Sequence, residues 1–234
     1  MSEVVSNPNN AGSDVVHDRD AMYYLMPITI KVEDTLFKLP RHSFMQHSPI
    51  FRDMFMVPQP AGVGGTTQPV DGSSDAQPLE LAVSKTDFRY LLEVLFPLDI
   101  PPSQNLPKEG WIAVLKLSNM WEMDKVRELA ITKLTACTMD SIEKILLSRE
   151  YHVPAWLRSG YQEFVDREAM LSDDDCQKIS YRSATQIFRI REDKLRRQYR
   201  GNYGTPALTI ETEFKDELAS EDAFFTSYSN RSML

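Results

Sequence analysis

The first regular pattern in the chain is an alternation of apolar and polar residues. Ile28, Ile30 and Val32 are separated by single polar residues, which is the period of a half-buried β-strand. A short acidic turn leads into a second extended stretch that ends at Pro40. The pattern therefore predicts a β-hairpin over residues 28–39.

Two short helices are expected after the hairpin, over residues 43–47 and 49–56. Ser48 is placed to cap the second helix, and Pro49 suits its first turn, where no N–H partner is needed. The large apolar residues of the second helix are expected to pack into the core: they are Phe51, Met54 and Phe55.

The pattern beyond residue 79 is mainly helical. Alternation of Leu79, Leu81 and Val83 predicts one more short strand. Apolar residues from Phe88 to Phe96 then recur at i, i+3, i+4, i+7 and i+8, the stripe of an amphipathic helix. Similar stripes continue to residue 200, and three helices are expected to begin at capping motifs: Ser84 with Asp87, Asp140 with Glu143, and Ser172 with Asp175. A small sheet followed by many helices predicts the α+β class.

Composition divides the chain into folded and unfolded parts. Residues 1–21 and 201–234 are polar, and residues 57–78 are rich in Gly and Pro. Such stretches bury too little apolar surface to offset the entropy of ordering the chain, so we expect two disordered tails and a flexible insert. The folded parts are then a domain over 22–139 and a helical extension over 140–200.

Charge and cysteine content narrow the class of protein. The 234 residues include 26 Lys and Arg against 34 Asp and Glu, a formal net charge of -8 at pH 7. An acidic surface repels phosphate backbones, which makes nucleic acid an unlikely partner. Two distant cysteines indicate a reducing compartment. No apolar run is long enough to span a bilayer and no signal peptide is recognisable, so we expect no membrane partner and an intracellular location, cytoplasmic or nuclear.

The order of these elements carries a resemblance to a known family. The eight residues from Ser48 read Ser-x-x-Phe-x-x-Met-Phe, a strand at 79–81 leads into the Phe and Leu stripe, and Trp121 opens the segment Trp-Glu-Met-Asp-Lys-Val. This series resembles the BTB/POZ family, and residues 151–192 look like the helical extension common in fungal BTB proteins. The resemblance implies a BTB/POZ-like fold, a small sheet covered by helices, over residues 22–139.

The resemblance also implies a function. Members of this family are non-catalytic protein–protein interaction modules that act as oligomerisation scaffolds or as substrate adaptors of ubiquitin ligases, some of them by binding a cullin. By that likeness the candidate partner-binding residues are Met56, Val57 and Trp121, and a cullin is a possible partner. Trp121 also fits the apolar stripe of its own helix, so burial is the alternative for its side chain. The segment before residue 28 lacks the amphipathic helix through which long BTB domains dimerise, so a homodimer is the weaker expectation.

Catalytic chemistry finds no support in the sequence. The four histidines lack the i, i+4 spacing of a helical metal pair: they are His17, His42, His47 and His152. The glycines at 62–65 have neither the preceding strand nor the Lys-Ser/Thr of a phosphate loop, and no Gly-x-Ser-x-Gly elbow occurs. We therefore expect no enzyme, no catalytic residue, no metal and no cofactor.

One local charge cluster opposes the acidic average. Six basic residues gather near the end of the last predicted helix: Arg189, Arg191, Lys194, Arg196, Arg197 and Arg200. A solvated helical face is the simplest interpretation. The alternative function is a transcription or chromatin-associated factor that uses this basic helix.

Overall fold

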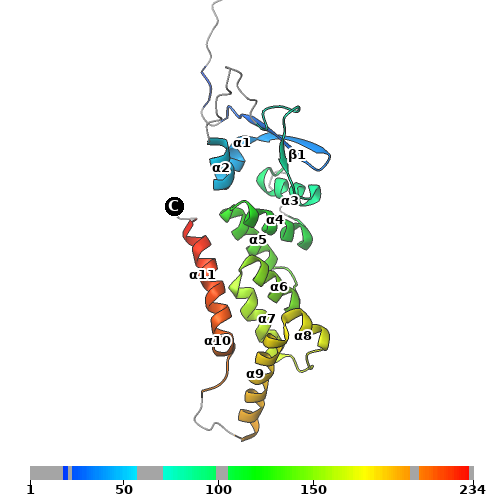
Figure 1. Cartoon of the computed structure of the whole chain (residues 1–234), viewed down its shortest axis with the longest axis vertical. Helices are drawn as coiled ribbons and strands as arrows, with labels where there is room; N and C mark the ends of the chain where they lie inside the picture. Colours follow the sequence, from blue (N-terminus) through cyan, green and yellow to red (C-terminus); the bar gives the residue numbers. More distant parts are fainter. Residues whose placement is uncertain (1–17, 21–22, 57–70, 99–104, 201–205, 232–234) are drawn as a thin grey trace, which may run out of the picture.

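The computed structural model describes residues 18–20, 23–56, 71–98, 105–200 and 206–231. The molecule is elongated, with the sheet toward one end and the last helix running back along the body (Figure 1). Most of the segments expected to be disordered or flexible near the start of the chain and in the insert lie outside the described residues. The chain combines a small sheet with many helices, so it is α+β as predicted.

The sheet has three strands and is built on the predicted hairpin. Strand β1 (Pro27–Val32) pairs antiparallel with β2 (Thr35–Pro40), and β3 (Leu79–Leu81) pairs parallel with β1. The two-residue turn places Glu33 at φ 53°, a left-handed conformation that tight hairpin turns require. The strand order β2-β1-β3 leaves β2 at an edge of the sheet.

The helix pair after the hairpin is held by one buried hydroxyl. Helices α1 (Arg41–His47) and α2 (Pro49–Met56) meet at Ser48, which is fully buried. Its Oγ accepts a hydrogen bond from the backbone N–H of Phe51 at 3.2 Å and donates one to the backbone carbonyl of Trp121 at 2.6 Å. The predicted cap is therefore present, and it also ties the helix pair to a distant segment.

Replacing this serine tests the double role. We expect Ser48→Ala to lower the free energy of unfolding by about 1–3 kcal/mol, because it leaves a buried carbonyl without its donor and α2 without its cap. Urea unfolding followed by circular dichroism measures the change. Ser84→Ala, which removes a half-buried cap with a single long contact of 3.4 Å to Asp87, is the matched control and should cost less. Equal losses would show that the bond to Trp121 contributes nothing.

The first core lies between the sheet and three helices, α3 (Lys85–Leu95), α4 (Lys108–Met120) and α5 (Asp124–Thr135). Aromatic rings form its centre. The ring of Phe88 lies 5.1 Å from Phe37, 6.5 Å from Phe44 and 6.1 Å from Trp121, centroid to centroid. Residues of α6 and α7 complete this core.

The predicted extension forms four helices, α6 (Ser141–Tyr151), α7 (Pro154–Asp166), α8 (Asp173–Ile179) and α9 (Tyr181–Arg200). The caps predicted at Asp140 and Ser172 are both present. These helices surround a second core, in which Gly160 allows close approach: a Cβ there would lie 2.9 Å from the carbonyl oxygen of Ser141.

The C-terminal part of the chain differs from its prediction. Residues 201–234 were expected to be disordered, yet α10 (Ile210–Glu213) and α11 (Lys215–Arg231) fold back along the extension. Three apolar residues spaced by four, Ile210, Phe214 and Leu218, are buried in the second core. The expectation is wrong for residues 206–231 because these three residues dock on helices that lie far away in sequence. None of the helices in the described ranges combines the length with the apolar composition that a membrane span requires.

Candidate functional site

The exposed end of α2 carries one predicted contact residue. Met56 is 63% exposed, and Ile50 and Met54 on the same helix are 41% and 37% exposed. Phe51 is buried as expected, whereas Met54 was expected in the core and instead faces solvent. Val57 lies outside the described residues. These three exposed side chains, Ile50, Met54 and Met56, are called the α2 surface below.

Trp121 lies inside the molecule and away from that surface. It is 7% exposed, and its ring meets Phe51 edge to face at 5.3 Å between centroids. The structure favours the buried alternative, so the Trp121 side chain supports α2 from below and is not itself a surface contact.

A shallow groove lies beside the edge strand. It has a volume of about 460 Å³ and runs between Leu39 of β2 and Leu92 of α3. Leu98 at its rim is almost fully exposed.

Burial lowers the pKa of His47, in α1, and the positive charge of Lys125 lowers it further. The imidazole of His47 therefore favours the neutral form.

The basic residues of α9 are largely paired within the chain. Lys194 pairs with Asp166 at 2.9 Å and Arg197 with Asp193 at 2.6 Å. Other contacts of the cluster join Arg189 with Glu213, Arg196 with Glu192, Arg191 with the carbonyl oxygens of Glu168 and Ala169, and Arg197 with the carbonyl oxygen of Pro206. The Arg200 side chain lies outside the described residues. Acidic neighbours thus offset most of the charge that the sequence places here.

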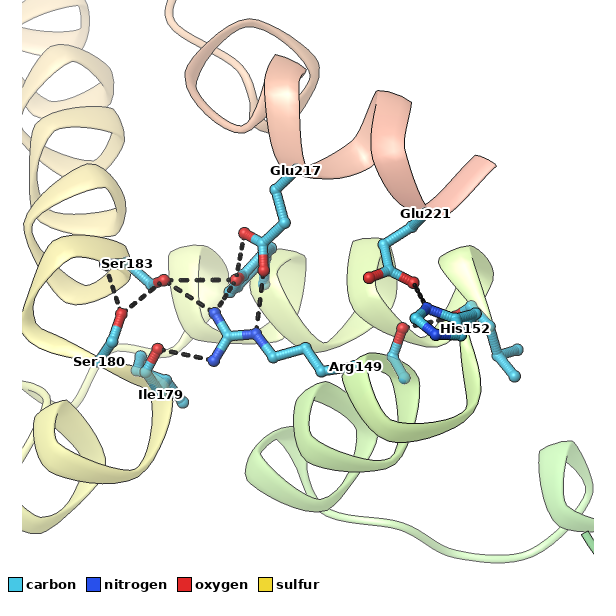
Figure 2. Close-up of polar contacts among 10 residues, drawn as sticks. Arg149, His152, Ile179, Ser180, Ser183, Glu217 and Glu221 are labelled. Atoms are coloured by element: carbon cyan, nitrogen blue, oxygen red, sulfur yellow. Dashed lines mark hydrogen bonds and ion pairs between the residues drawn. The ribbon is translucent and has the colours of Figure 1, made fainter. Parts of the chain in front are cut away.

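A polar cluster that sequence analysis missed joins α6, α7, α9 and α11. Arg149 donates from Nε to Glu217 at 2.9 Å, from Nη1 to the carbonyl oxygen of Ile179 at 2.9 Å, and from Nη2 to Tyr161 and Ser183 at 2.8 and 3.0 Å. Figure 2 shows the guanidinium at the centre of this set. The Tyr161 hydroxyl donates in turn to Glu217 at 2.9 Å. Burial raises the pKa of Tyr161, which keeps that hydroxyl protonated as a donor.

Three further basic side chains face α10 and α11. His152 Nδ1 lies 3.0 Å from a carboxylate oxygen of Glu221, and its ring stacks on Phe224 at 4.3 Å. The guanidinium of Arg127 lies 4.6 Å from the ring centroid of Tyr228. Arg158 binds Glu211 at 2.8 Å and Asp222 at 2.7 and 3.0 Å. The surface formed by Arg127, Arg149, His152 and Arg158 is called the α11 seat below.

The α11 seat is suited to holding a helix. Its basic groups come from α5, α6, the residue that follows α6, and α7, and they meet acidic and aromatic side chains of one docked segment. One sequence signal could have found that segment, since Glu213, Glu217 and Glu221 recur every four residues. In the described ranges, no group of three or more His, Cys, Asp or Glu residues is arranged to hold a metal ion.

Comparison with known proteins assigns no function to these surfaces. The sequence matches no model of a known protein family and no curated protein. The α2 surface and the α11 seat must therefore be interpreted from their own geometry and chemistry.

Proposed function

We propose that this chain is a non-catalytic protein–protein interaction module of the BTB/POZ type, acting as an oligomerisation scaffold or as a ubiquitin-ligase substrate adaptor. The order of its elements supports the proposal: a hairpin, a helix pair, a strand parallel to the first, and helices that cover the sheet. An intracellular location, cytoplasmic or nuclear, belongs to the same proposal.

The α2 surface is the observation that carries this function. Three apolar side chains of this short helix are exposed to solvent, Ile50 in its first turn and Met54 and Met56 in its last. Exposed apolar surface is typical of contact sites for other proteins, and the flexible thioether of methionine adapts to different partner surfaces. The proposed partners are a cullin or a second copy of this chain.

Charge substitution on this surface tests the proposal. We expect Met54→Glu with Met56→Glu to weaken binding of a purified cullin N-terminal domain by about tenfold or more, because two carboxylates would be desolvated at the contact. Isothermal titration calorimetry measures the affinity. Light scattering over a range of concentrations measures self-association of both proteins.

The control for this test is Met170→Glu, which changes a more exposed methionine outside the α2 surface. It should bind the cullin domain like the unaltered protein. The proposal fails if the unaltered protein neither binds the cullin domain nor self-associates, or if the double variant and the control behave alike.

The alternative of a transcription or chromatin-associated factor has weaker support. It depends on the basic residues of α9, and the described ones are engaged by acidic side chains or by carbonyl oxygens. A phosphate backbone would have to displace those partners, so the interaction module is the function that we propose.

A further inference from the structure

We propose that the α11 seat is a helix-binding site that α11 fills in cis, and that it accepts an acidic amphipathic helix of a partner protein in exchange. This inference concerns a different surface from the α2 surface and goes beyond the function proposed above. It rests on three features of the seat: its apolar contact, its charge, and the contacts that Arg127 and Arg149 make without α11.

The apolar contact is made by a segment that runs from α10 through Phe214 into the first turn of α11. Ile210, Phe214 and Leu218 follow one another at intervals of four and are 7%, 2% and 2% exposed. The Phe214 ring stacks on Tyr161 with centroids 3.9 Å apart. Anchors at this spacing are the recognition pattern of amphipathic helices that bind hydrophobic grooves. A partner helix must therefore offer apolar residues at the same spacing.

The charges of the seat select an acidic helix. Arg149 binds Glu217, and Arg158 binds Glu211 and Asp222. Glu221 is 8% exposed and hydrogen bonds to His152. Hydrogen bonds between ionised groups are stronger than those between neutral groups. A helix without carboxylates at these positions would leave basic groups of the seat unpaired, which disfavours it.

Two of the four basic groups of the seat, Arg149 and Arg127, make contacts that do not involve α11. Arg149 is held by the carbonyl oxygen of Ile179 and the hydroxyl of Ser183, and Arg127 donates to the carbonyl oxygen of Tyr151 at 2.6 Å. All of these contacts lie within α5–α9 (Figure 2 draws those of Arg149). Because these two guanidinium groups keep those contacts when α11 leaves, a second helix would find this part of the site already formed.

The attachment of α11 weakens along its length. Beyond Leu218, Glu221 is the one buried residue among those whose burial is described, and Phe224 is 49% exposed. The preceding turn is tied to α9, where Asp193 accepts from the backbone N–H of Leu208 at 3.0 Å. The chain that joins α9 to α10 also acts as a covalent tether. It gives α11 a high effective concentration at its seat, of the order of millimolar for a short linker. Exchange then requires a partner helix or a loss of the tether.

Cutting the covalent link between α9 and α10 lowers the effective concentration of α11 at the seat and leaves the residues of the seat unchanged. A protease recognition sequence is inserted between residues 200 and 206 of the full chain, and the folded protein is cleaved there. A fluorescein-labelled peptide of residues 206–231 is then titrated against cleaved and intact protein, with anisotropy as the readout. We expect the cleaved protein to bind the peptide about tenfold or more tightly than the intact protein, because the intact seat is occupied in cis.

Two further peptides test which chemistry the seat recognises. One keeps the three apolar anchors and the four carboxylates, with all other residues replaced by Ala, Gln or Lys; it should bind within about fivefold of the native peptide. The other carries Lys at 217, 221 and 222 and should bind about tenfold or more weakly. Where cleavage unfolds the protein, as seen by circular dichroism, the intact variant with Glu217→Gln, Glu221→Gln and Asp222→Asn replaces it.

Three results would overturn the proposal. The first is that the native peptide binds neither the cleaved protein nor the intact variant. The second is that the Lys-bearing peptide binds as tightly as the native one, which would leave the charges without a role in recognition. The third is a stable dimer by light scattering that excludes added peptide, which would show that the seat exchanges α11 only with a second copy of this chain.

Discussion

Phe88→Ala should lower the free energy of unfolding by about 3–5 kcal/mol, the range for removing a buried phenylalanine ring. Phe88 is fully buried in α3 and touches aromatic rings from β2, α1 and the end of α4. Its removal leaves a cavity bordered by stiff rings that cannot collapse into it. Because Trp121 packs against the same ring, we also expect α2, which rests on Trp121, to lose order.

Urea unfolding followed by tryptophan fluorescence measures this loss, since Trp121 lies 6.1 Å from the ring that is removed. Phe188→Ala is the matched control, because Phe188 is 39% exposed on α9 and its truncation should cost less than about 1 kcal/mol. A loss at Phe88 no larger than the loss at Phe188 would contradict the aromatic centre described for the first core.

Arg149→Met should lower the free energy of unfolding by about 2–4 kcal/mol, because four acceptors lose a charged donor in a half-buried site. The carboxylate of Glu217 would be left beside Tyr161 without its cation. Arg149→Lys keeps the charge, yet one ammonium cannot reach acceptors that the planar guanidinium serves together. We expect it to recover less than about half of the loss.

Hydrogen exchange distinguishes a loss of α11 docking from a loss of stability of the whole fold in this variant. The increase in exchange rate caused by Arg149→Met should be about tenfold or more larger for amides of α11 than for amides of β1 and α4 in the first core. Arg182→Met is the control, since Arg182 is exposed near the same cluster and its loss should leave α11 unchanged. Uniform loss of protection would show that Arg149 supports the whole fold and not the docking of α11.

Local signals explain what could be predicted from the sequence. The hairpin follows from alternation and a two-residue turn, and the caps at Ser48, Ser84, Asp140 and Ser172 follow from side chains that bond within three residues. Both partners of each of these interactions lie within a short stretch of chain, so the interactions can be recognised from the local sequence alone.

The docking of α10 and α11 could not be predicted in the same way. Their apolar anchors are few, and four of their acidic side chains meet partners 50 or more positions earlier, as Glu221 meets His152 at a separation of 69 residues. Met54 shows the converse case, in which an apolar residue on a helix lies on the solvent side. Sequence periodicity reports which residues share a face, but not what that face meets.

The position of α11 in the chain has a consequence for its synthesis. Every helix that forms the α11 seat precedes α11 in the sequence. At roughly 5–20 residues per second, translation takes about 2–6 s to proceed from the end of α9 to the end of α11. During that interval the nascent protein presents the basic groups of the α11 seat before α11 has been synthesised. A partner helix present at the ribosome would then bind the seat without competition from α11.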